Sequence, residues 1–375
     1  MYEEESKIMA YEVDFIGVNE TKKDSDAIGI RWKEGEKFKV GVYDGGISKY
    51  GEKLKEHIEQ YYFDENNEEK TIDFALCSHS DLDHVSGMKH ILENFDVKVL
   101  YMNRPWLYVD DVIENAKSYD GRITKESLER RLKENYKYIA ELEEIAAEKG
   151  IEIKEAFQGE LIEERFTVLS PTKEFYLELL VESDKTALEE AEQRADNNSF
   201  GAKLKAVYEY VMSLLESWSD EKLRDNVTTS AENEMSVVLL GSMDEEDFLL
   251  TGDVGLRGLD MAINYSEAIS NPIIDNVKFL QIPHHGGRHN VGPSILNRLV
   301  GNIVEEGKTI NKTAYVSAGK NSDHPLQIVV NAFTRRGVEV FKTNGKSIRY
   351  YKNMPGREGW TTIKKIEFKP EVEEW

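Results

Sequence analysis

The sequence predicts a layered α/β fold. Apolar, strand-like runs alternate with amphipathic helices along the chain, and clusters of His, Asp and Gly directly follow several of the strands. Strand, helix and strand in this order are typical of a crossover unit in a layered structure. Ligands bind in the crevice beyond the ends of such strands, so we expect the polar clusters to meet at one edge of the fold.

The first third of the chain opens with several strand signals. Its opening segments alternate apolar and polar side chains with the period of a strand, and residues 33–36 form a short hairpin-like connection. Helices are expected at 49–62 and 88–93. Strands are expected at 10–18, 27–32, 37–42, 72–77 and 97–102.

Helical periodicity dominates the middle of the chain. Apolar residues at helical spacing predict a helix over 124–150, with Gly150 as its C-terminal stop. Residues 152–157 and 166–169 return to strand character. Residues 172–226 then predict two or three charged amphipathic helices, which we interpret as a helical insertion. It would serve as a lid, a partner surface or a dimer contact, or remain a solvated appendage.

The last third alternates strands and helices again, and it ends in a strand-like run at 361–368. A helix is expected at 326–335. We divide the chain into a main domain at 9–352, with the insertion at 172–226 inside it, and a C-terminal strand and tail at 353–375. Further strands are expected at 235–240, 247–250, 277–280, 313–316, 338–341 and 347–351.

Composition and charge indicate a globular protein with an uneven charge distribution. The formal net charge is −23, yet residues 276–370 hold 16 Lys and Arg against 6 Asp and Glu. This basic third is compatible with a phosphate-bearing substrate, or it is only a solvated surface. No apolar run approaches the roughly 18 residues that cross a bilayer, so no membrane partner is expected. An acidic start and a single cysteine, Cys77, favour a cytoplasmic protein.

One segment concentrates side chains that bind metals. His79, Asp81, Asp83 and His84 lie within six residues, directly after the predicted strand at 72–77. Imidazole nitrogen and carboxylate oxygen suit Zn, Mn and Fe, and one loop of this kind can serve two metals. The alternative is a solvated turn that happens to be rich in Asp and His, but such turns seldom follow a buried strand.

Further polar clusters follow other predicted strands. They contain Asp253, the pair His284 and His285, and Lys320 with His324. Two adjacent divalent ions need a carboxylate that bridges them, together with terminal ligands on either side. Asp253 ends a strand and is the natural bridge. The loop at 79–84 then supplies terminal ligands to both ions, and the histidine pair supplies one more.

Four motifs occur in a distinctive order: His79-Ser80-Asp81-Leu82-Asp83-His84, Leu250-Thr251-Gly252-Asp253, Ile282-Pro283-His284-His285-Gly286-Gly287 and His324-Pro325. This order resembles the metallo-β-lactamase fold, and within it the hydrolase domain of the competence protein ComEC and its soluble relatives. The similarity spans Tyr11 to about Tyr351. It implies an αββα sandwich, interrupted here by the helical insertion, and two divalent metal ions, Zn or Mn.

The resemblance also implies which residues hold each metal ion. Asp253 lies between the two ions, and the second ion takes one of His284 and His285, with the alignment favouring His284. The terminal ligands are His79 and Asp81 for the first ion, and Asp83 and His84 for the second.

The family's third histidine on the first metal is missing from this chain. It should fall within 231–236, where Asn233 stands nearest. Oxygen from Asp81 and Asn233 in place of two imidazoles moves the metal preference from Zn towards Mn or Mg. We therefore expect activation by Mn to be at least as strong as activation by Zn.

The candidate catalytic residues are Asp83, Lys320 and His324. We expect His324 to donate a hydrogen bond to a phosphoryl oxygen or to protonate the leaving group, while Lys320 and Asn321 help to hold the phosphate. The alternative is that Asp323 and His324 cap the helix that follows them.

Three classes of function fit these observations. The first is a metal-dependent phosphodiesterase, a nuclease that cleaves DNA by attack of a metal-bridging hydroxide, as the ComEC-like resemblance implies. The second is hydrolysis of a small molecule, such as a cyclic nucleotide, a phosphoester, a lactone or a β-lactam, because one fold hosts many activities. The third is a module that retains the fold and binds a protein partner, or a second copy of itself, through residues 172–226.

Overall fold

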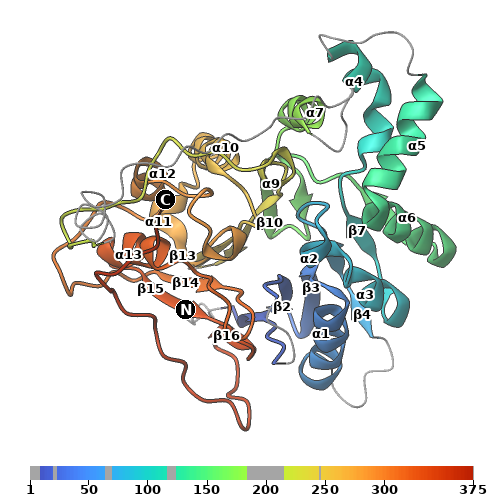
Figure 1. The fold of residues 1–375 in the computed structure, drawn as a ribbon. Helices are drawn as coiled ribbons and strands as arrows, with labels where there is room; N and C mark the ends of the chain where they lie inside the picture. The colour runs from blue at the N-terminus through green and yellow to red at the C-terminus, as the bar shows by residue number, and fades with distance from the viewer. Residues whose placement is uncertain are drawn as a thin grey trace, which may run out of the picture.

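The computed structural model describes residues 9–19, 23–63, 70–115, 124–183, 215–244 and 246–374. Two seven-stranded β-sheets lie face to face at the centre, and helices cover the outer face of each sheet (Figure 1). The predicted αββα sandwich is therefore confirmed. Among the described residues, no helix has the length and apolar character that a membrane span requires.

The first sheet is antiparallel on one side and parallel on the other. Strands β16, β1, β2 and β3 pair antiparallel, whereas β3, β5, β7 and β8 run parallel. A short parallel pair, β4 (Thr71–Ile72) and β6 (Asp96–Val97), forms a separate small sheet. In spatial order the sheet holds β16 (Ile348–Lys352), β1 (Tyr11–Phe15), β2 (Ala27–Glu34), β3 (Lys37–Gly45), β5 (Phe74–Leu76), β7 (Val99–Tyr101) and β8 (Glu152–Lys154).

The second sheet has the same mixed character. Strands β9 to β12 pair antiparallel, and β12 to β15 run parallel. In spatial order the sheet holds β15 (Glu339–Lys342), β14 (Thr313–Val316), β13 (Val277–Gln281), β12 (Glu246–Leu250), β11 (Val238–Met243), β10 (Phe166–Ser170) and β9 (Leu161–Ile162). Parallel strands end on the same side of a sheet, so the segments that follow β12, β13 and β14 lie close together.

Aromatic side chains fill the space between the two sheets. Phe15 of the first sheet packs edge-on against Phe279 of the second at 5.9 Å between ring centroids, and Trp32 packs against Phe166 at 4.9 Å. Such pairs add about 0.5–1.5 kcal/mol beyond the area they bury. The core that holds the sheets together is therefore apolar on both inner faces.

Apolar stripes on the helices cover the outer faces of the sheets. α1 (Ser48–Tyr61), α3 (Met88–Asn94) and α6 (Lys137–Lys149) pack on the first sheet, and α5 (Lys125–Asn135) and α7 (Lys173–Glu182) extend the same apolar core beside it. The second sheet is covered by α10 (Leu256–Ala268), α12 (Pro293–Leu299) and α13 (Gln327–Arg335). The shorter helices are α2 (Leu82–Val85), η1 (Pro105–Tyr108), α4 (Val109–Asn115), α9 (Ala231–Glu234), α11 (Ile273–Asn276) and η2 (His284–Gly286).

The predicted helix at 124–150 is divided into two. α5 ends at Asn135 and α6 begins at Lys137, and Tyr136 between them has φ −102° and ψ 40°, outside the helical region. Tyr136 is buried, and its hydroxyl lies 3.2 Å from Ser183 Oγ. The helix therefore breaks where this aromatic side chain turns into the core.

The proposed insertion at 172–226 is helical at its start, where α7 forms as expected. Residues 184–214 lie outside the described residues. Residues 215–226 contain no helix, in contrast to the prediction, and Glu216 pairs in the core with Arg335 of α13 at 3.0 Å. This buried ion pair attaches residues 215–226 to α13, and the segment packs there without regular secondary structure.

The strand predicted at 361–368 is not formed. A hydrogen bond from Ile366 N–H to the Val340 carbonyl, 2.7 Å long, attaches the segment to β15. Ile366 packs on the helical side of the second sheet, whereas Ile363 packs against the core between the sheets. The alternation of apolar and polar residues therefore reflects anchoring on the rim of the sandwich, without a strand.

Candidate metal centre

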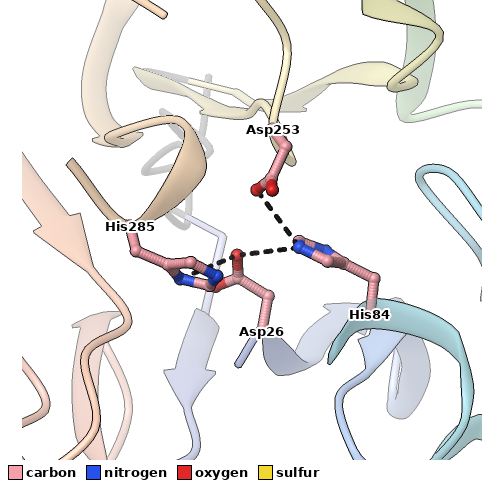
Figure 2. A group of neighbouring side chains, drawn as sticks. All are labelled: Asp26, His84, Asp253 and His285. Atoms are coloured by element: carbon pink, nitrogen blue, oxygen red, sulfur yellow. Dashed lines mark ion pairs between the residues drawn. The ribbon is translucent and has the colours of Figure 1, made fainter. Parts of the chain in front are cut away.

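Segments at one end of the sandwich bring the polar clusters together. Asp26 directly precedes β2, His84 lies in α2 beyond β5, Asp253 follows β12 and His285 follows β13. Gly252 has φ 51°, in the left-handed region that favours glycine, and this lets the chain turn directly before Asp253. Figure 2 shows the four side chains pointing toward one another from these separate segments.

These four residues, which we call the four-residue centre, offer ligand atoms within 4.8 Å of one another, and all four are buried. His84 Nε2 lies 3.1 Å from Asp253 Oδ1 and 3.9 Å from Asp26 Oδ2 (Figure 2). His285 Nδ1 lies 3.7 Å from Asp26 Oδ2. Two carboxylates and two imidazoles thus converge on one small volume.

Several ligand-type atoms at this end of the fold make no hydrogen bond within the described part of the chain. Leaving one buried polar atom unpaired costs about 1–3 kcal/mol, and more when the group is charged. Divalent cations bound among them would give these atoms partners, so the donor set fits metal ions. The atoms are both carboxylate oxygens of Asp26, Oδ1 of Asp253, and Nε2 of His79, His84 and His285.

Asp44 fixes the orientation of His84. Its Oδ2 lies 2.8 Å from His84 Nδ1 and accepts a hydrogen bond from the Ser78 hydroxyl at 2.6 Å, while its Oδ1 accepts from the Ser78 N–H at 2.7 Å. Asp44 is fully buried and has φ 58°. A carboxylate on Nδ1 directs Nε2 of His84 toward the centre and increases its basicity as a ligand.

His79 and Asp81 lie beside the four-residue centre, as the sequence predicts. His79 Nε2 is 3.9 Å from Asp81 Oδ2 and 3.9 Å from Asp253 Oδ2, and the rings of His79 and His84 are 4.3 Å apart. Ser236 Oγ lies 3.2 Å from His79 Nδ1 and accepts the Asp253 N–H at 3.1 Å. Ser236 therefore positions both the imidazole and the carboxylate.

The structure distinguishes the two members of the histidine pair. His285 belongs to the four-residue centre and is 4% exposed, whereas the His284 side chain is 38% exposed and lies outside that group. The sequence left open which of the two binds the second ion, with the alignment favouring His284, and of the pair only His285 belongs to the group of neighbouring ligand atoms in the described part of the chain. His284 Nε2 nevertheless faces Asp253 Oδ2 at 3.6 Å.

Asp83 and Asn233, two other predicted ligands, differ in what they face. Asp83 Oδ2 lies 3.5 Å from His285 Nε2, next to the centre. The Asn233 amide nitrogen donates to Thr229 Oγ1 at 2.8 Å and lies 3.3 Å from His284 Nδ1. Asn233 thus contacts the Nδ1 side of the His284 ring, whereas the Nε2 side of that ring faces Asp253.

The loop that holds Lys320 and His324 is fastened beside the centre by Asp24. His324 Nδ1 lies 2.8 Å from Asp24 Oδ2, which also accepts the Ser322 hydroxyl at 2.8 Å. The ring of His324 lies 6.4 Å from that of His285. His324 therefore lies beside the centre, and Lys320 is exposed on the same loop.

The capping role considered for Asp323 and His324 is wrong. The first N–H groups of α13, those of Gln327 and Ile328, donate to the carboxylate of Glu373 at 2.7 and 3.1 Å. A carboxylate from the C-terminal tail thus satisfies the positive end of this helix. His324 is left to interact with Asp24 instead.

Sequence reasoning missed Asp24 and Asp26 and gave Asp44 no definite role. Both missed residues precede a strand, and the search for ligands considered only residues that follow strands. The segment around them contains no histidine, so it had the appearance of a polar loop. Inspection of the starts of predicted strands would have found Asp26, because β2 runs antiparallel to its neighbours β1 and β3 and its start lies beside the end of β3.

Opposed charges dominate the electrostatics of the centre. Burial alone would lower the pKa of both histidines, but Asp253 and Asp44 raise the pKa of His84 well above its ordinary value, and carboxylates led by Asp26 raise the pKa of His285 to about 10. Burial would raise the pKa of Asp253, but His84 and His285 hold it well below its usual range. Without a metal ion, protons on the imidazoles therefore balance the carboxylate charge.

Comparison with known protein families agrees with this fold. A model of the metallo-beta-lactamase superfamily matches residues 32–150, which include the loop with His79, Asp81, Asp83 and His84. Among curated protein sequences, none matches this chain significantly.

Three solved structures illustrate the structural likeness. A metal-dependent hydrolase of the beta-lactamase superfamily has a TM-score of 0.41 and 13% identity, with 91% of this chain and 98% of that chain covered. A CmlA beta-hydroxylase mutant has a TM-score of 0.38 and 11% identity, with 92% of this chain and 54% of that chain covered. AidC, a dizinc quorum-quenching lactonase, has a TM-score of 0.29 and 12% identity, with 67% of this chain and 69% of that chain covered. These similarities concern the fold and leave the substrate of this chain open.

Proposed function

We propose that this chain is a metallo-beta-lactamase superfamily protein and a metal-dependent hydrolase that cleaves phosphodiesters, with DNA as its substrate; the fold and the family match over residues 32–150 support this proposal. One observation carries the proposal: four aspartates, Asp26, Asp81, Asp83 and Asp253, gather around the histidines. Carboxylate oxygens favour hard cations such as Mn and Mg, which also bind phosphate oxygens.

Bound divalent ions would activate a water molecule and neutralise charge on the phosphoryl oxygens. The residues of the chain hold and orient the reacting groups. Asp44 keeps His84 in a fixed tautomer and direction, and the hydroxyls of Ser236 and Ser78 hold Nδ1 of His79 and so orient its ring. Because the groups are held before the substrate arrives, the reaction requires little reorganisation of the protein.

His324 and Lys320 would act on the substrate from the rim of the centre. Asp24 accepts a hydrogen bond from Nδ1–H of His324 and so leaves Nε2 as the reactive nitrogen. From there His324 can donate to a phosphoryl oxygen or protonate the leaving group. Lys320, exposed on the same loop, adds positive charge for the phosphate, and the surplus of Lys and Arg in residues 276–370 supports a polyanionic substrate.

The proposal is tested by cleavage of fluorescent single- and double-stranded DNA, with bis-p-nitrophenyl phosphate and nitrocefin alongside. Mn and Zn are supplied separately to chelator-treated protein. We expect hydrolysis of DNA and of the phosphodiester, at least as fast with Mn as with Zn, and loss of both activities in Asp83→Ala. Hydrolysis of nitrocefin with neither phosphate substrate cleaved would overturn the proposal.

A small-molecule substrate is the second candidate, and one feature of the centre favours it. Leu82, between Asp81 and Asp83, is 40% exposed, so an apolar side chain points into the solvent among the charged residues. Such a residue would pack against an apolar group of a lactone or a nucleotide base. A protein partner or self-association through 172–226, a ComEC-like subfamily and a cytoplasmic location remain predictions.

A further inference from the structure

We propose that His284 and His285, although adjacent in the chain, bind different metal ions. His284 would give the first ion the imidazole that residues 231–236 lack, and His285 would join a second, more carboxylate-rich site. This inference rests on the dinuclear centre of the proposed function, and it assigns every ligand of that centre from contacts within the chain.

The backbone at the pair has an unusual conformation. His284 has φ 49° and His285 has φ 53°, and Gly286 follows with φ 83°. Positive φ occurs in only a few per cent of non-glycine residues, and consecutive examples persist where the surrounding structure enforces them. Here the His284 N–H donates to the Gly252 carbonyl at 3.1 Å, which ties the pair to the turn before Asp253.

This conformation separates the two imidazoles, whose ring centroids are 6.1 Å apart. In an extended strand, successive side chains point to opposite faces, so only one of two neighbours would reach a given crevice. With both residues in the left-handed region, both rings reach the centre, but from different sides. The two histidines can therefore serve two ions.

The two carboxylate oxygens of Asp253 face different imidazoles, as expected if each oxygen binds a different ion. Oδ1 faces His84, with Nε2 at 3.1 Å. Oδ2 faces His79 and His284, with Nε2 at 3.9 and 3.6 Å. Ligand atoms of a tetrahedral ion with bonds of about 2.1 Å lie about 3.4 Å apart, so each set of distances is close to that of one ion's ligands.

Asn290 fixes the tautomer of His284 as a ligand requires. Its amide nitrogen donates to the carbonyls of Asp253 and Val254 at 2.7 and 3.3 Å, so its Oδ1 must be the atom 2.8 Å from His284 Nδ1. An amide oxygen can only accept, so Nδ1 carries the proton and Nε2 presents its lone pair toward Asp253. Asn233 lies on the protonated Nδ1 side of the ring, away from Asp253, and is therefore outside the ligand set.

His285 is oriented toward the second site by a different acceptor. Its Nδ1 lies 3.1 Å from the Ser317 carbonyl, so this nitrogen carries the proton and Nε2 faces Asp83 Oδ2 at 3.5 Å. The second site then holds three carboxylates and two imidazoles: Asp26, Asp83, Asp253, His84 and His285. The first holds two of each: His79, Asp81, His284 and Asp253.

The two sites therefore differ in chemistry. Four mixed ligands suit tetrahedral Zn, whereas five ligands rich in oxygen suit Mn, which prefers six-fold coordination by hard donors. The preference for Mn that the sequence assigned to the first ion belongs, on this geometry, to the second, because Asp26 adds its carboxylate there.

The test is the metal content of purified protein reconstituted with Mn or with Zn and then desalted, measured by elemental analysis with no activity assay. Wild type is expected to hold two ions per chain, and His284→Ala one. The control His289→Ala removes an exposed histidine from the same loop, and Asn233→Ala removes the nearest alternative ligand; both should keep two. Circular dichroism verifies that each variant is folded.

Electron paramagnetic resonance of the Mn form gives a second readout. Two neighbouring Mn ions are expected to couple in the wild type, and an isolated Mn signal should appear in His284→Ala. Two ions and a coupled signal in His284→Ala would overturn the assignment of His284. Fewer than two ions in the wild type would instead overturn the dinuclear centre on which the proposed function depends, so the two failures are distinguishable.

Discussion

Two buried groups of charged side chains lie in this sandwich, and they differ in how their charges are balanced. The four-residue centre combines carboxylates with imidazoles at the end of the sheets. A second group, which we call the arginine cluster, lies on the first sheet beneath α1 and the C-terminal segment. It consists of Glu12, Asp14, Arg31, Arg349 and Arg357.

The carboxylates of the arginine cluster are paired with guanidinium groups within the chain. Glu12 is fully buried and accepts from Arg31 at 2.6 Å and from Arg357 at 2.8 Å. Burial would raise the pKa of Asp14, but His57 and Arg357 hold it below its usual range. A guanidinium group keeps its charge at every accessible pH, so this cluster needs no added ion.

At the four-residue centre the balancing charges are exchangeable protons. Without metal, His84 and His285 are held in their charged forms by the carboxylates around them, and ligand atoms of all four residues lack hydrogen bonds within the described part of the chain. A cation can replace those protons. The contrast shows that burial of charge alone does not indicate a binding site, whereas unpaired ligand atoms with exchangeable protons do.

The largest expected effect is on catalysis, when a carboxylate of the four-residue centre is removed. Asp253→Asn removes the carboxylate whose two oxygens face His84 on one side and His79 and His284 on the other. We expect turnover of bis-p-nitrophenyl phosphate to fall by about 10³-fold or more, which corresponds to a rise in the activation free energy of about 4 kcal/mol. The control is Asp247→Asn, which changes a buried aspartate at the opposite end of β12. If Asp253→Asn retained more than a tenth of wild-type turnover, the centre would not be the site of the reaction.

The arginine cluster should instead respond in stability. Arg357→Met leaves Glu12 and Asp14 buried with fewer partners, and breaking a buried ion pair from one side costs about 3 kcal/mol or more. Urea unfolding measures this loss, and metal content should not change. Arg130→Met, which removes an exposed arginine of α5, should leave the urea midpoint almost unchanged. A loss of bound metal in folded Arg357→Met would contradict the separation of the two groups.

Much of the fold was predictable because the signals are local. Apolar and alternating runs predicted the strands of both sheets except β9, although the run at 361–368 forms no strand, and the cluster His79 to His84 was visible because four ligand-type residues lie within one short loop. Asp26 escaped because a lone carboxylate gains its meaning only when tertiary packing sets it beside His84 and His285. The roles of His284 and His285 depend on two positive φ angles, which the residue types themselves disfavour.

The smallest expected effect is on the pH dependence of metal affinity, which reports the protons held by His84 and His285. His84 and His285 have raised pKa values without metal; that of His285 is about 10, so His285 is charged at pH 7, and the carboxylates around His84 favour its charged form. A metal ligand must be a neutral imidazole, so binding displaces these protons. Metal affinity should therefore rise with pH, about tenfold per pH unit for each proton released, until the pH approaches 10.

Titration calorimetry in buffers of different ionisation enthalpy measures the number of protons released. We expect one to two protons per chain between pH 7 and 9, because at least His285 is charged throughout this range. Arg357→Met should release the same number, since the arginine cluster retains its protons whether or not metal is bound. Release of no protons at pH 7 would mean that the carboxylates do not hold the imidazoles in their charged forms, and the distinction between the two buried groups would then rest on geometry alone.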